Sequence, residues 1–187
     1  MSYNPTTGPD FGLGATEILA DGSEGVFNRL LATSTAGASN GNFRGPYFTC
    51  RKSQTITKIR TIVGSTNQVG ATLCRIGLYT VDASDNLTLV ASTANDTSLW
   101  ASAGTAYDKA LSASYAVTRG TRYAVGHLVV GASQAPSLAG FTLLNGAVGN
   151  TLPRTGFLIG SQTDLPSSLA VGSMTGSNVM TYAALVP

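Results

Sequence analysis

Apolar and polar residues alternate over short stretches along most of this chain, which is the pattern of β-strands that bury one face. The stretch 110–118 shows it most clearly, because Leu111, Tyr115 and Val117 would share one face while Ser112 takes the other. Similar stretches predict strands at 43–50, 55–63, 72–81, 87–93, 110–118, 122–131, 138–144, 155–160 and 177–186. No long amphipathic helix interrupts them. We therefore expect an all-β fold, an antiparallel β-sandwich or jelly roll of about eight strands.

The first 35 residues have a different character. Residues 1–20 are rich in Gly, Pro and Thr and are typical of an extended arm, whereas residues 21–35 could hold a short helix with Ser23 as its N-cap. We therefore divide the chain into residues 1–35, the arm with this possible short helix, and residues 36–187, the sandwich domain.

The last predicted strand, 177–186, is apolar on both faces. A sandwich strand normally has one solvated face, so this one needs a cover on each side, and a symmetry-related copy is the simplest second cover. From residue 123 to the end only Arg154 and Asp164 are charged, as is typical of surfaces hidden in an assembly. The pattern predicts a homo-oligomer whose interface contains Val179, Met180, Tyr182, Leu185 and Val186.

Charge and composition exclude several classes of protein. Only 11% of the 187 residues are charged, too few for a disordered tail or a helical bundle, and Gly is frequent, with 22 residues. The net charge of +2 gives no basic stripe, so no nucleic-acid partner is expected. The N-terminus shows no signal peptide, and Ser, Thr and Asn interrupt the uncharged stretch 165–187, so we expect no membrane insertion.

Residues with catalytic or metal-binding chemistry are few. His127 is the single histidine and no nucleophile motif accompanies it, so we expect a structural or interface role. Cys50 and Cys74 match no zinc pattern and are expected to be reduced and buried, with a disulfide between neighbouring strands as the alternative. The segment DASDN (82–86) predicts a hairpin turn, with a bound cation as the alternative. We expect no enzymatic activity, no cofactor and no metal site.

A sugar cradle is the one ligand site for which the sequence offers candidates. The ring of Trp100 could stack on a sugar while Asp96, Tyr107 and Asp108 bind its hydroxyl groups. The alternative is that Trp100, the single tryptophan, fills a core.

Several segments between about residue 14 and the end of the chain carry a resemblance to a known family. They are NRLLATST (28–35), YFTCRKSQTITKIRTIVG (47–64), RIGLYTVDASDNLTLVASTANDTSLW (75–100), YDKALSASYAVTRGTRYAVGHLVVGAS (107–133), and SQTDLPSSLAVGSM (161–174) through YAALVP (182–187). Together they resemble small virion proteins of phages that infect actinobacteria, which are usually labelled minor tail proteins. The resemblance implies a virion surface module on a jelly-roll-like sandwich, assembled in the host cytoplasm, and a trimer as the oligomer. It supplies no catalytic residues.

These observations predict a non-enzymatic virion protein, a minor tail or fibre module that contributes to host-surface attachment. A capsid decoration or head-fibre protein and an isolated carbohydrate-binding module are the alternatives. The expected partners are other copies of the chain, other virion proteins bound through the N-terminal arm, and a host cell-surface glycan. Because loops usually carry function in sandwich folds, we expect host contact at 64–71, 94–108 and 131–137.

Overall fold

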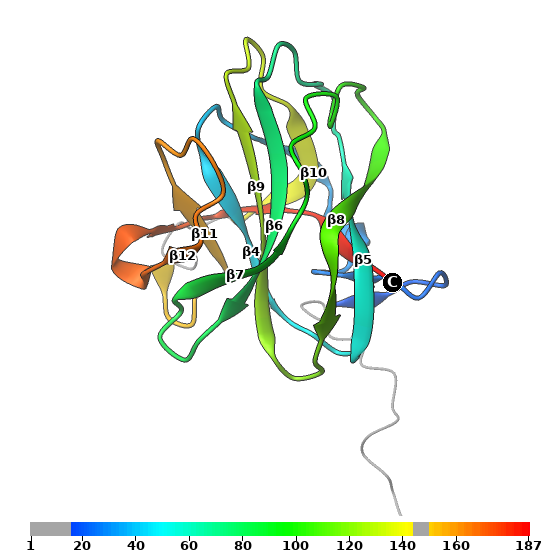
Figure 1. Cartoon of the computed structure of the whole chain (residues 1–187), viewed down its shortest axis with the longest axis vertical. Helices are drawn as coiled ribbons and strands as arrows, with labels where there is room; N and C mark the ends of the chain where they lie inside the picture. Colours follow the sequence, from blue (N-terminus) through cyan, green and yellow to red (C-terminus); the bar gives the residue numbers. More distant parts are fainter. Residues whose placement is uncertain (1–15, 144–149) are drawn as a thin grey trace, which may run out of the picture.

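The computed structural model describes residues 16–143 and 150–187, which form antiparallel β-sheets with little other regular structure (Figure 1). The largest sheet has seven strands in the spatial order β12-β7-β6-β9-β4-β11-β13. In that order their bounds are Ser168–Leu169, Leu87–Ser92, Leu73–Val81, Arg122–Val130, Phe43–Thr49, Gly156–Ile159 and Thr175–Gly176.

Two smaller sheets face it. The five-stranded sheet has the order β1-β2-β15-β5-β8, with bounds Glu17–Ile18, Glu24–Gly25, Ala183–Val186, Gln54–Ile62 and Ala106–Val117. The three-stranded sheet has the order β14-β10-β3, with bounds Val179–Thr181, Ser137–Thr142 and Ser34–Gly37. The sheets curl around a shared interior like a half-closed barrel, which confirms the predicted all-β, sandwich-like fold.

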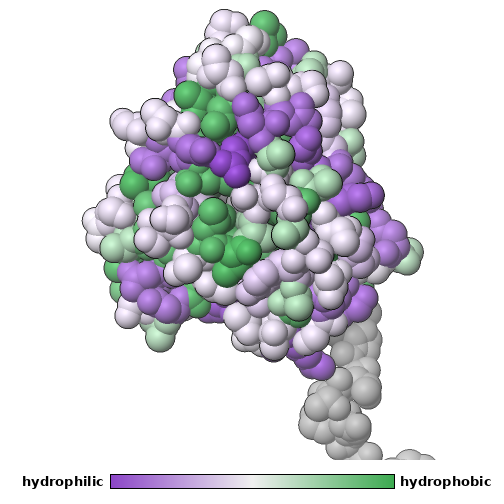
Figure 2. Space-filling model, in the orientation of Figure 1, coloured by the Kyte–Doolittle hydropathy of each residue, from purple (hydrophilic) through white to green (hydrophobic). Residues whose placement is uncertain are grey.

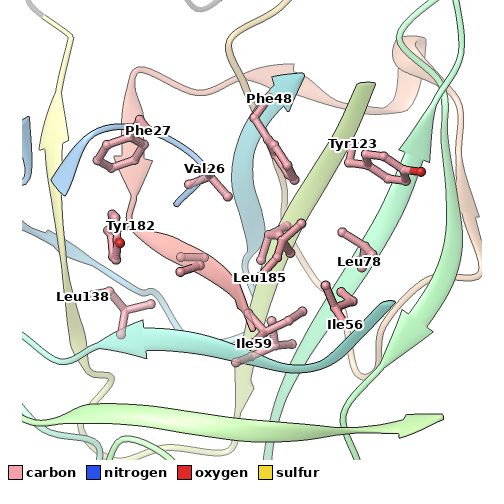
Figure 3. Close-up of a cluster of buried hydrophobic side chains, with 14 of the residues drawn as sticks. Val26, Phe27, Phe48, Ile56, Ile59, Leu78, Tyr123, Leu138, Tyr182 and Leu185 are labelled. Atoms are coloured by element: carbon pink, nitrogen blue, oxygen red, sulfur yellow. The ribbon is translucent and has the colours of Figure 1, made fainter. Parts of the chain in front are cut away.

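The main core lies between the seven-stranded sheet and the two smaller sheets (Figure 3). Ile59 from β5, Leu78 from β6 and Leu185 from β15 meet there, and each is fully buried. On β6 the predicted alternation places Cys74, Ile76 and Leu78 on this inner face. Apolar surface removed from water by such packing is the main favourable term in folding.

A second core covers the opposite face of the same sheet. Tyr79 points away from the main core and packs with Phe43 and Phe157, and the segment between β11 and β13 supplies Leu165, Leu169 and Met174 as a lid. The buried Tyr79 hydroxyl donates a hydrogen bond to the carbonyl of Pro166 at 2.9 Å. The C-terminal third therefore carries few charges in part because it packs against the body of its own chain.

The C-terminal strand is also covered within one copy of the chain. It divides into β14, which pairs with β10, and β15, which lies between β5 and β2. Met180, Tyr182 and Leu185 are at most 3% exposed in the single chain. Their assignment to an oligomer interface is wrong, because three sheets of the same molecule bury them. Val179 and Val186 remain partly exposed.

The short helix predicted within 21–35 does not form. Glu24 and Gly25 belong to β2, which pairs with β15 on one side and with β1 on the other, and only a single 3-10 turn follows at Arg29–Leu31. Its N-cap is Asn28, whose side chain accepts the Leu30 N–H, and Ser23 instead bonds to Asp21.

The predicted arm, residues 1–20, ends earlier than expected, because residues 17 and 18 already form β1. Residues 1–15, which hold most of that arm, lie outside the described part of the chain. Within residues 16–143 and 150–187, no helix has both the length and the apolar character needed to cross a bilayer.

Candidate functional site

Three loops that lie far apart in the sequence meet at one end of the molecule, the upper end in Figure 1. They comprise residues 64–71 after β5, 94–105 before β8 and 131–136 after β9, and we call this end the apex. These regions are the contact loops that the sequence predicts. The predicted ranges 94–108 and 131–137 extend slightly too far, since Ala106 begins β8 and Ser137 begins β10.

Backbone hydrogen bonds join the first two loops. The Gly104 N–H donates to the Gly64 carbonyl at 2.9 Å, and the Gln68 N–H donates to the Trp100 carbonyl at 2.9 Å. The Gln68 side chain is buried and donates to the carbonyl of Thr97. Because buried polar groups are costly unless paired, these bonds hold the two loops in one arrangement.

The third loop is joined to the first in the same way. Val69 and Gln134 form an isolated antiparallel bridge, in which the Val69 N–H donates to the Gln134 carbonyl at 2.9 Å. The Gln134 side chain donates to the carbonyl of Asn67 at 2.9 Å, and the Ser133 hydroxyl donates to that of Val69 at 3.1 Å. The apex is therefore one hydrogen-bonded surface made of three loops.

Trp100 is the plug beneath this surface. It is fully buried, its indole N–H donates to the Thr61 hydroxyl at 2.9 Å, and its ring meets the His127 ring edge-on with centroids 6.1 Å apart. Its φ of +69° is unusual for a bulky residue, and the buried indole holds the backbone in that conformation. Of the two interpretations of Trp100, the one in which it fills a core is confirmed, and stacking on a ligand is wrong, because no face of its ring is exposed.

The other residues of the predicted sugar cradle do not converge. Asp96 forms an ion pair with Lys109 at 2.7 Å, and hydrogen bonds from Lys109 and Ser98 lower the pKa of Asp96 to about 2. Tyr107 and Lys109 share one face of β8, whereas Asp108 points to the other, as neighbouring residues of a strand must.

Both carboxylate oxygens of Asp108 bind Arg60, at 2.6 and 2.7 Å, and the Tyr107 hydroxyl accepts the Ser102 N–H at 2.8 Å. The structure thus brings no ligand cradle together from Asp96, Trp100, Tyr107 and Asp108. Asp96, Tyr107 and Asp108 are at least partly exposed, and their contact with a ligand stays a prediction.

The outer surface of the apex is polar but almost uncharged. In its three loops Asp96 is the single charged residue, and the exposed positions are mainly Ser, Thr, Asn, Gln, Gly and Ala, with Val69 47% exposed. Figure 2 shows this upper end as mostly pale and hydrophilic surface, with a few hydrophobic atoms at its tip. Hydroxyl and amide groups both donate and accept hydrogen bonds, so this surface suits a neutral, hydroxyl-rich partner.

His127 lies inside the body, below the apex. It is 3% exposed, its Nδ1 lies 3.4 Å from the Thr181 hydroxyl, and its Nε2 has no hydrogen-bond partner among the described residues. Burial, assisted by the positive charge of Arg44 on the neighbouring strand β4, lowers the pKa of His127 to about 3. The histidine is therefore a neutral core residue at physiological pH, in agreement with the structural role expected.

This burial makes the fold sensitive to mild acid. The unfolded chain protonates His127 near pH 6.5 and the folded chain only near pH 3, so stability falls as pH drops through that window, by up to about 1.4 kcal/mol per pH unit. Between about pH 6.5 and pH 4.5 most carboxylates stay ionised. We expect wild type to lose roughly 2 kcal/mol of unfolding free energy over this range, measured by urea denaturation. His127→Gln, which cannot titrate, should lose much less; an equal loss would contradict this role.

Both cysteines are free and buried, so the expected reduced thiols are confirmed. Burial raises the pKa of Cys50 and of Cys74 to about 11, which keeps both protonated and unreactive. The Cys50 thiol donates to the carboxylate of Glu24, a fully buried residue that also accepts hydrogen bonds from the Thr16 hydroxyl and the Arg51 N–H.

The DASDN segment forms the predicted hairpin turn between β6 and β7. Asp82 accepts the backbone N–H groups of Ser84 and Asn86, while Asp85 turns inward to bind Arg122 and the Arg154 N–H. This partly buried ion pair could not be predicted from the sequence, because Asp85 and Arg122 are adjacent only after the sheet has formed. No cluster of three or more His, Cys, Asp or Glu side chains suited to a metal occurs in residues 16–143 and 150–187.

No family model matches the chain, and no curated protein sequence matches it.

Proposed function

We propose that this protein is a non-enzymatic structural module of a bacteriophage virion, a minor tail or fibre module that contributes to host-surface attachment through its apex. The resemblance of its segments to small virion proteins of actinobacterial phages supports the virion role. The joined loops of the apex support the attachment role, because a rigid scaffold that carries polar loops at one end is a common arrangement for binding.

The observation that carries this proposal is that the N-terminal segment and the apex lie at opposite ends of the molecule. Thr16, the first described residue, is tied to the loop between β4 and β5, since its carbonyl accepts a hydrogen bond from Arg51 at 2.8 Å. That loop precedes β5 and the apex follows it, so the nine residues of β5, about 30 Å of strand, separate the two. The N-terminal segment is thus connected at one end of the body, and the loops project from the other.

The partner we propose for the apex is a neutral glycan of the host cell surface, since the apex carries one charge and many hydroxyl and amide groups. A capsid decoration or head-fibre protein is the second candidate, because a docked module with an outward surface would fit that site as well. Trimer formation stays a prediction, and Met180, Tyr182 and Leu185 are already buried within one copy of the chain.

The location in the particle tests the proposal directly. Gold-labelled antibody against this chain should label the tail tip or fibres of the parent virion in electron micrographs. Label on the capsid faces would favour the decoration role and contradict attachment, and particles that bind no antibody would contradict the virion role itself.

The N-terminal segment should dock the module onto the particle. Deleting residues 1–20 would also remove β1, so the cleaner change is deletion of residues 1–8, which lie well before Thr16. The shortened protein should fold as wild type does by circular dichroism but fail to incorporate into particles. A chain with residues 1–8 replaced by Gly and Ser controls for length and should fail as well; normal incorporation of either would refute docking through this segment.

A further inference from the structure

An apolar pocket of about 430 Å³ opens beside the 3-10 turn Arg29–Leu31. Apolar side chains form most of its wall, among them Phe27, Phe141 and Met180. Phe27 meets the rings of Phe141 and Tyr182 nearly at right angles, with centroids 5.0 and 5.6 Å away. Because Phe27, Met180 and Tyr182 are also buried in the main core, the pocket is a preformed feature of the folded chain.

Leu30 protrudes at the rim of this pocket. It is 80% exposed, more than any other large apolar side chain among the described residues, whereas its neighbour Leu31 belongs to the pocket wall. The turn that carries both leucines is fixed at its start. The Asn28 side chain accepts the Leu30 N–H at 3.0 Å, and the Asn28 carbonyl accepts the Leu31 N–H at 2.9 Å. Leu30 is thus held outwards beside an apolar hollow.

One ion pair borders the same turn. The Arg29 Nε lies 3.3 Å from a carboxylate oxygen of Glu17, and the Arg29 backbone N–H donates to the other oxygen at 3.1 Å. The Arg29 side chain is 58% exposed, so its guanidinium is also available to a group outside the molecule. When two copies meet here about a two-fold axis, Arg29 of each can face Glu17 of the other. The charges at this rim are therefore complementary to those of a second copy.

We propose that the occupant of the pocket is Leu30 of a second copy of the chain. Since the protruding leucine and the pocket lie side by side on one surface, a two-fold axis between them seats Leu30 of each copy in the pocket of the other. This mutual exchange is the arrangement of an isologous interface. An apolar anchor seated in a preformed pocket is also typical of the residues that dominate the binding energy of interfaces.

This inference does not depend on the proposed function, because it concerns only how two copies of the chain meet. The resemblance to virion proteins implies a trimer, whereas this contact makes a dimer. Mass in solution distinguishes the two.

Sedimentation of the full chain tests the proposal. Wild type at micromolar concentration should have the mass of a dimer. Leu30→Ser should raise the dissociation constant about a hundredfold or more, because each dimer loses two seated leucines. Leu152→Ser is the matched control, since it removes another exposed leucine that lines a different hollow, beside Asp85, and it should dimerise as wild type does. A monomeric or trimeric wild type, or an equal loss from both variants, would overturn the proposal.

A second variant tests the pocket itself. Thr155 is exposed and lines the pocket, so Thr155→Trp should fill the pocket and weaken association as strongly as Leu30→Ser does, although Leu30 is intact. Both changes are at exposed positions, so circular dichroism should show wild-type folding for each. Wild-type association of Thr155→Trp would overturn the assignment of the pocket.

A contact between copies gives the most direct evidence. In a mixture of isotope-labelled and unlabelled chains, a filtered nuclear Overhauser experiment detects only contacts between different copies. We expect a cross-peak between the Leu30 methyl groups of one copy and the Phe141 ring of the other, with the methyl signals identified by Leu30→Ala. A dimer that lacks this cross-peak would show that the copies meet at another surface and would overturn the proposal.

Discussion

Replacing Leu185 with aspartate should leave no folded protein at room temperature. Leu185 is fully buried in the main core, where it lies opposite Ile59 of β5 and Glu24 of β2. The change removes a core leucine, worth about 2–5 kcal/mol, and buries a carboxylate without a designed partner. The sum reaches the 5–15 kcal/mol that stabilises a typical domain.

Val186→Asp is the matched control, because the next residue of the strand points to the other face, is partly exposed and lies opposite Lys58. Its unfolding free energy should change by less than about 1 kcal/mol. Circular dichroism and urea denaturation measure both variants. A Leu185→Asp protein that folds and merely dissociates from a larger assembly would show that the C-terminal strand is an interface after all.

Replacing Trp100 with alanine should have the second largest effect, a loss of about 3–5 kcal/mol of unfolding free energy. The indole is fully buried below the apex, and its removal leaves a cavity and frees the Thr61 hydroxyl. Trp100→Phe keeps most of the volume but loses the hydrogen bond to Thr61, so it should cost about 1–2 kcal/mol. Both losses are read from urea denaturation.

The apex should also loosen in Trp100→Ala, because the Trp100 carbonyl holds the Gln68 N–H. Amide hydrogen exchange of Gln68 and Val69 measures this loosening. Val69→Ala, at an exposed apex position, controls for general loop effects and should leave the unfolding free energy nearly unchanged. Full stability of Trp100→Ala would mean that the indole is no plug and would restore its candidacy as a ligand contact.

Strand positions could be predicted from the sequence wherever pairing follows simple alternation. On β6, Cys74, Ile76 and Leu78 face the main core as their spacing predicts. The opposite face is also buried, but its cover comes from Leu165 and Leu169, more than 80 residues away, and no local pattern indicates such a lid. Alternation also fails on β5, where a register shift after Ile56 turns both Ile56 and Ile59 inward.

Two errors have the same physical cause, long-range pairing that local patterns do not show. The apolar spacing near Val26 and Phe27 favours a helix, yet Gly25 and Glu24 are held in a strand by β15, which lies about 160 residues later in the chain. The two apolar faces of the C-terminal strand correctly indicate two covers. The second cover also comes from the same molecule, for example from Phe27, whose ring meets that of Tyr182 edge-on, and not from another copy of the chain.

The candidate site was predicted in part. The loops predicted at 64–71 and 131–137 were recognisable from their turn residues, and the structure joins them through Val69 and Gln134. The core role of Trp100 was predicted only as one of two interpretations, because a lone tryptophan in a loop is compatible with both a stacking platform and a plug. Its burial depends on Thr61 and His127, which neighbouring strands place beneath it.

Competition for adsorption tests the central claim, that the apex is the surface that contacts the host. Purified protein should reduce adsorption of the parent phage to host cells, and Ser65→Trp, which places a large ring on the apex, should need about tenfold more protein for the same effect. Ser84→Trp makes the same change in the β6–β7 turn at the opposite end and should compete as wild type does. Equal competition by all three proteins, or a larger loss from Ser84→Trp, would contradict the account.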